Sequence, residues 1–196
     1  MEAGVLAGLA GGYALGSVPF GLLLTRAAGA GDIRAIGSGN IGATNVLRTG
    51  RKGLAAATLL LDMLKGLAAV LLARALWGEQ AGLAAAAGAM VGHCFPVWLR
   101  FRGGKGVATM LGVSAGLGWA IGLVAALAWL GCFRLSRISS VGGMGAALAA
   151  PIAAVALGEW GKAPLLAALA LLVVAKHHAN IARLIAGEEP RVGRKG

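Results

Sequence analysis

Two glycine-rich polar segments hold the residues of this chain whose types and spacing suit chemistry. Residues 37–49 read Gly-Ser-Gly-Asn-Ile-Gly-Ala-Thr-Asn-Val-Leu-Arg-Thr, and residues 103–106 read Gly-Gly-Lys-Gly. Proteins hold phosphate oxygens with uncovered backbone N–H groups and nearby cations, here Arg48 and Lys105. The segments therefore predict phosphate binding, and their candidate ligands are Gly37, Ser38, Gly39, Asn40, Gly42, Thr44, Asn45, Arg48, Gly103, Gly104, Lys105 and Gly106.

The predicted phosphate is not expected to belong to a nucleotide. The glycines at 37, 39 and 42 match the spacing of a dinucleotide fingerprint, and Asp62 follows about twenty residues later. That fingerprint requires a preceding strand within a βαβ unit, whereas long apolar segments flank these glycines and Asp62 lies inside one of them. The segment at 103–106 also lacks the spacing of a nucleotide-binding P-loop.

A third polar cluster lies near the carboxyl end of the last apolar segment. His177, Asn180 and Arg183 follow one another at intervals of three and share one face of a helix. His177 alone suits a structural histidine, but beside Asn180 it becomes a candidate for positioning or proton transfer. Asp62 and Lys65, one turn apart, are expected to form an intrahelical pair, with direct catalysis as the second choice.

The elements that position these clusters are expected to cross a membrane. The chain of 196 residues is 58% hydrophobic and 13% charged, with a mean hydropathy of +0.81. Residues 3–25, 80–99 and 106–133 carry no charge, and such runs are candidate membrane spans. A soluble all-helical protein would need polar helix faces that these segments lack. The net charge of +11 falls between the spans, which argues against a nucleic-acid partner and suits anionic lipids.

The distribution of charge predicts the topology. Basic residues concentrate in the gaps 26–52, 100–105 and 134–139 and in the tail from 176, which the positive-inside rule places in the cytoplasm. Residues 106–133 therefore cross an even number of times, as two short helices divided at Gly116-Leu117-Gly118. The prediction is an all-α bundle of seven transmembrane helices: 3–25, 53–76, 80–99, 106–117, 118–133, 140–158 and 162–182.

This topology orients the chain as one membrane-embedded domain over residues 1–196. Arg26 follows the first apolar segment and no positive charge precedes it, the reverse of a secretory signal, so we expect a retained span. The N-terminus is expected outside, with a short basic cytoplasmic tail from about residue 185. Neither the spacing of Cys94 and Cys132 nor the single acid, Asp32, in the cytoplasmic gaps before the tail indicates a metal site, and no cofactor is expected.

Three motifs in order resemble those of the acyl-phosphate-dependent glycerol-3-phosphate acyltransferases, the PlsY family of bacterial integral membrane enzymes. The first is Gly37 to Arg48. The second runs from Gly92-His93-Cys94-Phe95-Pro96 to Gly103-Gly104-Lys105-Gly106-Val107-Ala108-Thr109, and the third joins His177, Asn180-Ile181, Arg183-Leu184 and Gly187-Glu188-Glu189. The chain departs from the family in His178-Ala179, which replaces a more usual basic-polar pair. The family's serine after the fifth span matches Ser139 or Ser140, and we favour Ser140.

The resemblance implies transfer of a fatty acyl group from acyl phosphate to the 1-hydroxyl of sn-glycerol 3-phosphate, giving lysophosphatidic acid and phosphate. The expected catalytic residues are Ser38, Arg48, Lys105, His177 and Asn180. The expected proton acceptor is His177 or the donor's phosphate, and a covalent acyl-Ser38 intermediate is the rival route. The implied location is the bacterial inner membrane, and the soluble enzyme that makes acyl phosphate is a further implied partner.

A small-anion transporter or channel is the alternative function. Such a protein also needs basic loops and glycine-rich helices, but it should carry polar residues at mid-membrane and an inverted repeat. The polar clusters of this chain are one-sided, and only Asp62 and Lys65 lie deep.

Overall fold

A computed structural model describes residues 1–192, and the described residues form helices and no strands. This confirms the all-α class. The α-helices are α1 (Glu2–Gly16), α2 (Phe20–Ala27), α3 (Ala43–Leu47), α4 (Lys52–Trp77), α5 (Glu79–Cys94), α6 (Val107–Leu117), α7 (Trp119–Ser136), α8 (Ser139–Ala156), α9 (Ala163–Lys176) and α10 (His178–Ile185). A short 3₁₀ turn at Ile33–Ala35 lies in the first polar gap, and another at Val97–Leu99 follows α5, which ends at Cys94 within the span expected over 80–99. Of the expected basic tail, residues 193–196 lie outside the described residues.

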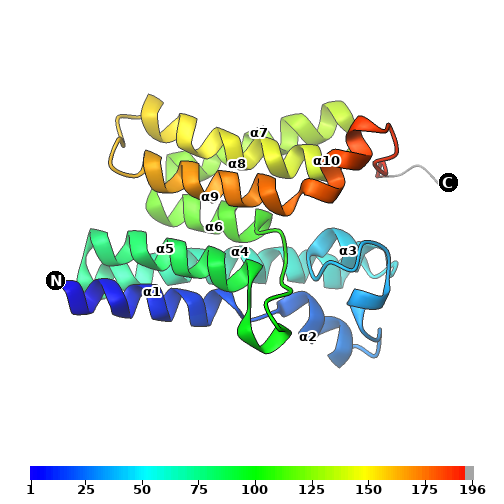
Figure 1. The fold of residues 1–196 in the computed structure, drawn as a ribbon, viewed down its shortest axis with the longest axis horizontal. Coiled ribbons are helices and arrows are strands. Elements are labelled where there is room, and N and C mark those ends of the chain that lie inside the picture. Colours follow the sequence, from blue (N-terminus) through cyan, green and yellow to red (C-terminus); the bar gives the residue numbers. More distant parts are fainter. Residues whose placement is uncertain (193–196) are drawn as a thin grey trace.

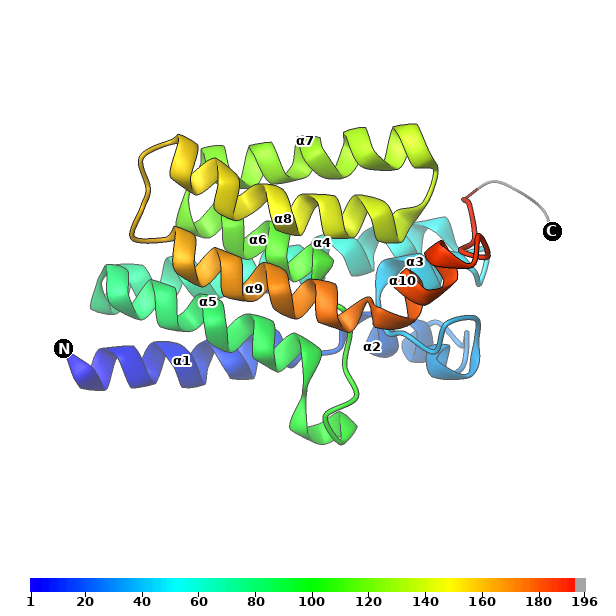
Figure 2. The same ribbon diagram turned by 45° about the horizontal axis from the view of Figure 1, so that its top comes forward.

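The long helices lie side by side in two groups joined by α6 (Figures 1 and 2). One group packs α1 and α4 with α5, and the other packs α8 between α7 and α9. Helix α6 contacts helices of both groups, and its Met110, Val113 and Leu117 are buried in the main apolar core. The central position of α6 allows it to be short, because protein rather than lipid surrounds its ends.

Five helical segments are long and apolar enough to cross a membrane, and the bent pair α9–α10 makes a sixth. Leucines on the outer face of α7 remain about half exposed, as in Leu123, Leu127 and Leu130. Apolar side chains on the outside of a bundle are what a lipid environment requires. The chain is therefore built as a polytopic membrane protein.

The structure corrects three of the expected helix boundaries. The first span is confirmed as one apolar segment, Glu2–Ala27, but its helix is interrupted at residues 17–19, because Pro19 has no N–H to continue α1 and a new helix begins at Phe20. The division at Gly118 is present, and α6 has 11 residues, but α7 runs for 18 residues to Ser136 and is not short. The last span bends by 61° at His177.

Glycines let α1 and α5 approach until their backbones touch. Gly8, Gly12 and Gly16 form the buried face of α1, and Gly88 and Gly92 of α5 pack against the α1 backbone in return. Small residues favour such close helix packing in membranes. The many glycines of the sequence thus have a structural role here.

Replacing Gly12 with alanine should lower the thermal unfolding midpoint of the purified protein. The added Cβ would lie 2.8 Å from the Cα of Ala85 and closer still to its carbonyl oxygen, so the two helices must separate. Overpacking of this kind costs about 1–3 kcal/mol. Gly11→Ala is the matched control, because the same Cβ one residue earlier has no atom within 4 Å. Equal midpoints for the two variants would contradict the packing described.

Candidate active site

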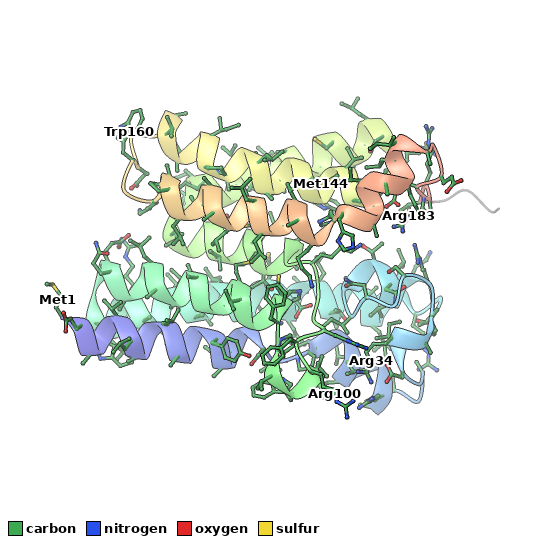
Figure 3. All side chains as sticks on the ribbon, viewed as in Figure 1. Met1, Arg34, Arg100, Met144, Trp160 and Arg183 are labelled. Carbon is green, nitrogen blue, oxygen red and sulfur yellow. The ribbon has the colours of Figure 1, made fainter. Side chains whose placement is uncertain are left out.

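The predicted site residues meet at one end of the bundle. Figure 3 places Arg34 and Arg183 at this end, and Met1 and Trp160 at the opposite end. A cavity of about 400 Å³ opens here between α3, α6, the α7–α8 turn, α10 and the chain that follows α10. Its lining includes Ser38, Asn40, Gly42, Thr44, Asn45, Arg48, Lys105, Gly106, Ser139, Ser140, His177, Asn180 and Arg183.

Four of the predicted ligands do not line this cavity. Gly37 and Gly39 lie behind the first loop with φ of +56° and +66°, and a Cβ on Gly37 would collide with Arg48 and Asn45. Gly103 and Gly104 lie behind the second loop, where their N–H groups donate to the carbonyls of Cys94 and His93. The sequence therefore located the loops, and the structure adds that these glycines are positioned for backbone shape and packing.

Asn45 organises the first loop from inside. Its Nδ2 lies 2.8–2.9 Å from the carbonyl oxygens of Ile33, Ile36 and Asn40, which share its two hydrogens, and its Oδ1 accepts from the N–H of Ser38. The side chain is buried, so these bonds fix the curvature of the loop. Asn45 borders the cavity, but its amide is already used by the loop.

The remaining polar groups of the first loop face the cavity. Asn40 Oδ1 accepts the N–H of Gly42 at 2.8 Å and so begins the turn into α3. Thr44 and Ser139 share a hydrogen bond between their hydroxyls at 2.9 Å. Arg48 ends α3, and within residues 1–192 its guanidinium has no ion-pair partner, which leaves its planar donors for an anion.

Lys105 enters the cavity between the glycines and α6. The N–H groups of Lys105 and Gly106 donate to no backbone carbonyl in the described chain, and α6 begins immediately after them. Burial lowers the pKa of Lys105, and the cations Arg183, Arg48 and Lys176 lower it further, whereas Glu189 opposes them. A half-buried ammonium with free N–H groups beside it is a suitable anion site.

Glu189, in the segment after α10, connects that segment to α8 and α10 by hydrogen bonds beside the cavity. It accepts hydrogen bonds from Ser140 Oγ at 2.7 Å, from Asn180 Nδ2 and from Arg183 Nε at 2.7 Å. Asn180 Oδ1 in turn accepts from Lys105 Nζ. Burial raises the pKa of Glu189, but these hydrogen bonds outweigh burial and hold the pKa below that of an ordinary glutamate. One carboxylate thus orients Asn180, and through it Lys105.

His177 lies at the bend between α9 and α10. Its Nδ1 faces the carbonyl of Val173 at 2.7 Å, so Nδ1 must carry the hydrogen of that bond. In the neutral ring Nε2 then keeps its lone pair, and His177 borders the cavity. This geometry allows His177 to accept a proton or a hydrogen bond from a ligand.

Sequence reasoning missed several residues of the cavity. Glu189 stood in a motif but was given no role, because only the folded chain shows that it reaches Asn180 and Ser140. The apolar lining was also missed, since leucines and tryptophans in apolar helices carry no distinguishing sequence signal. Its members include Leu47, Leu59, Val107, Trp129 and Val192.

Glu189→Ala should lower turnover about 10- to 100-fold, because it frees Asn180 and lets Lys105 shift. The neighbouring Glu188→Ala is the control, since Glu188 is exposed and its side chain makes no hydrogen bond or ion pair among the described residues.

Lowering the pH of the wild-type enzyme should reduce turnover in the same way as Glu189→Ala, because protonation of Glu189 removes the same contacts. Above the ordinary glutamate pKa of about 4.3 the carboxylate contacts are complete. They are lost as the pH falls through the depressed pKa of Glu189. A pH profile unchanged by Glu189→Ala on its acid side would contradict this assignment.

Comparison with known proteins identifies the family of this chain. The family model described as glycerol-3-phosphate acyltransferase matches residues 6–187. A glycerol-3-phosphate acyltransferase of Erythrobacter litoralis is 59% identical over 184 residues, covering 94% of this chain and 93% of the relative. One of Brucella ovis is 58% identical over 185 residues, covering 94% and 92%.

Two crystal structures of PlsY (YgiH), an integral membrane glycerol 3-phosphate acyltransferase, have the same fold. The glycerol 3-phosphate form superposes with a TM-score of 0.91 at 34% identity, covering 96% of each chain. The lysophosphatidic acid form gives a TM-score of 0.89 at 33% identity, covering 96% of this chain and 95% of the other. With the motifs in order and the whole fold matched, this chain belongs to the glycerol-3-phosphate acyltransferase family.

Proposed function

We propose that this protein transfers a fatty acyl group from acyl phosphate to the 1-hydroxyl of sn-glycerol 3-phosphate, releasing lysophosphatidic acid and phosphate. The observation that carries the proposal is the convergence of Arg48, Lys105, His177 and Asn180 on one cavity in a chain about 58% identical to named acyltransferases. Both substrates carry a phosphate, and four cationic side chains line the cavity: Arg48, Lys105, Arg191 and Arg183, the last of which is paired with Glu189. Acyl phosphate is a mixed anhydride, so the reaction needs no further activation of the acyl group.

In the proposed mechanism the 1-hydroxyl attacks the acyl carbonyl directly. The new ester bond forms, the acyl–phosphate bond breaks, and the hydroxyl proton passes to His177 or to the departing phosphate. Lys105 and Arg48 hold the phosphates and stabilise the negative charge that develops. Ser38 and Asn180 orient the acceptor. The polar ligands proposed beside them are Asn40, Gly42, Thr44, Gly106 and Ser140. Asn45 contributes by fixing the first loop from within, and Gly37, Gly39, Gly103 and Gly104 shape the loops.

The apolar lining suits the acyl chain of the donor and product. Leu47, Leu59, Val107 and Trp129 border the same cavity as the cations. A site that meets phosphates with cations and a hydrocarbon chain with apolar side chains matches an amphipathic substrate. This supports a substrate that reaches the site from the lipid phase.

The proposed setting is the bacterial inner membrane, with one domain, seven passes and the cavity on the cytoplasmic side. Helix α6 supplies the seventh, short pass, and its burial among α4, α7, α8 and α9 supports that role. The basic loops gather at the cavity end, which the positive-inside rule favours for the cytoplasm. This arrangement leaves the N-terminus outside and gives a soluble acyl-phosphate-forming enzyme access to the site.

The test is conversion by purified protein. Incubation with long-chain acyl phosphate and glycerol 3-phosphate should yield lysophosphatidic acid and an equal amount of phosphate. Acyl-CoA in place of acyl phosphate should give no product, because it brings no acyl phosphate group to the cations. Absence of product with acyl phosphate, or equal rates with both donors, would refute the proposed reaction.

Direct attack also predicts no exchange of labelled phosphate into acyl phosphate when glycerol 3-phosphate is omitted. A covalent acyl-Ser38 intermediate would permit that exchange. Ser38 Oγ makes no hydrogen bond to another described side chain, so no base within residues 1–192 is in contact to activate it. Exchange that disappears in Ser38→Ala would establish the covalent route instead.

A further inference from the structure

We propose that His93 is a positioning residue that sets where Lys105 lies, by serving as the surface on which Gly104 packs. The proposal deepens the function proposed above and rests on it, because it concerns the same phosphate-binding loop. It assigns to His93 and Asp62 a role in the site that the mechanism leaves unassigned, although both border the cavity.

His93 contacts Gly104 twice. The carbonyl of His93 accepts the N–H of Gly104 at 3.0 Å, and the imidazole lies directly against the Gly104 Cα. The three atoms nearest to a Cβ added at Gly104 would all belong to this ring, with Nε2 nearest, Cε1 at 2.8 Å and Cδ2 at 3.0 Å. Glycine is therefore required at 104 because a histidine side chain occupies the space.

The far edge of the ring faces a buried charge pair. His93 Nδ1 has no hydrogen-bond partner in the described structure and lies 3.8 Å from Asp62 Oδ1. The same Asp62 oxygen lies 2.6 Å from Lys65 Nζ, and Lys65 Nζ also donates to the carbonyl of Val18 at 2.7 Å. These contacts fix Asp62 beside the ring, so the imidazole lies between a fixed carboxylate and the loop.

The packing of Gly104 on the His93 ring determines where Lys105 lies. Lys105 is the next residue after Gly104, its Nζ donates to Asn180, and α6 begins two residues later. The loop thus contacts His93 through Gly104 and Asn180 through the side chain of Lys105. Displacement of a binding group by about 1 Å can lower catalysis on the order of 100-fold, so the packing at Gly104 bears on turnover.

A suppression experiment tests the proposal. Gly104→Ala should lower kcat/KM for glycerol 3-phosphate about 100-fold. His93→Ala, which removes the ring, should lower it roughly tenfold. The double variant should return to about the level of His93→Ala, because the new methyl group then has space.

Gly103 supplies the matched control. A Cβ on Gly103 would meet Pro96 and the backbone of His93 and Cys94, which no change of the His93 side chain removes. Gly103→Ala should therefore be impaired equally with and without His93→Ala. A double variant of Gly104 and His93 no better than Gly104→Ala alone, or rescue of Gly103→Ala as well, would overturn the proposal.

Two further readouts separate positioning from general stability. Loss of folded protein would reduce kcat and leave KM unchanged, whereas a displaced Lys105 should raise KM for at least one of the two phosphate substrates. His93→Ala with an unchanged KM for both substrates would overturn the proposed role. If Gly104→Ala yields no folded protein, recovery of folded protein in the double variant is the expected result, and its failure also overturns the proposal.

The same variants separate a failure of this proposal from a failure of the proposed function. Wild-type protein that forms no lysophosphatidic acid refutes the function. The steric suppression is still measured by the thermal unfolding midpoints, which should fall in Gly104→Ala and recover in the double variant. Midpoints that fail to recover overturn the packing role even where the wild-type enzyme is active.

Discussion

Lys105→Ala is expected to lower kcat/KM with acyl phosphate and glycerol 3-phosphate about 100- to 1,000-fold. The variant removes the half-buried ammonium that lies within hydrogen-bonding reach of Asn180 and borders the cavity. Removing a charged group that stabilises the negative charge of a transition state typically lowers the rate by this factor. Arg48→Ala should have a comparable effect, because its guanidinium also lines the cavity and, unlike Arg183, has no ion-pair partner among the described residues.

Arg102→Ala is the control for Lys105→Ala. Arg102 lies three residues earlier on the same loop, is exposed and does not border the cavity. It carries the same charge, so its removal tests whether general electrostatic attraction is enough. Turnover should stay near wild type in Arg102→Ala. Near-normal activity in both Lys105→Ala and Arg48→Ala would refute the site assignment.

The alkaline limb of the wild-type pH profile should reflect the same residue. Burial, with Arg183, Arg48 and Lys176 nearby, lowers the pKa of Lys105 despite the opposing effect of Glu189. The ammonium therefore loses its proton at a pH below the ordinary lysine pKa of about 10.4, and turnover should fall with it. Lys105→Arg should remove this limb, since a guanidinium keeps its charge.

Asp62→Ala is expected to destabilise the protein by about 3–5 kcal/mol. The substitution leaves Lys65 as an unpaired ammonium whose side chain is only 3% exposed. The thermal unfolding midpoint in detergent should fall sharply, and expression with it. Stability is the appropriate readout here, because Asp62 also borders His93 and the cavity.

The companion variant replaces both partners, as Asp62→Leu with Lys65→Met. Removing the two charges together avoids the unpaired ion, so the double variant should be more stable than Asp62→Ala. A double variant as unstable as the single would mean that shape, not charge, governs this position. The pair lies at 2.6 Å inside α4, as the sequence spacing predicted.

The sequence was sufficient to name residues that the fold brings to one cavity, because its signals are local. Arg48, Lys105, His177 and Asn180 lie in short motifs whose polar residues interrupt apolar segments, and charge placement put those gaps on one side. The break at Gly118 followed from the same charge rule. These inferences needed only residue types, spacing and the thickness of a bilayer.

The internal connections were beyond the sequence because they join distant residues. The contact of Glu189 with Ser140 spans 49 positions, and Asn45 is shared among three carbonyls that only a folded loop brings together. The glycines at 103 and 104 suggested uncovered donors, yet their N–H groups are used by the end of α5. A glycine that serves packing and one that binds a ligand look alike until the neighbour is known.

The glycine face of α1 has a consequence for how the chain is made. Its partner α5 begins at Glu79, about 60 residues after α1 ends at Gly16. At synthesis rates of roughly 5–20 residues per second, α1 is finished roughly 3–12 s before α5 starts to emerge. During that interval the grooved surface of α1 faces lipid or the insertion machinery. We therefore expect α1 to pack on α5 only after this delay. Until then its glycine face, Gly8, Gly12 and Gly16, is the surface on which a chaperone or a wrong helix would compete with α5.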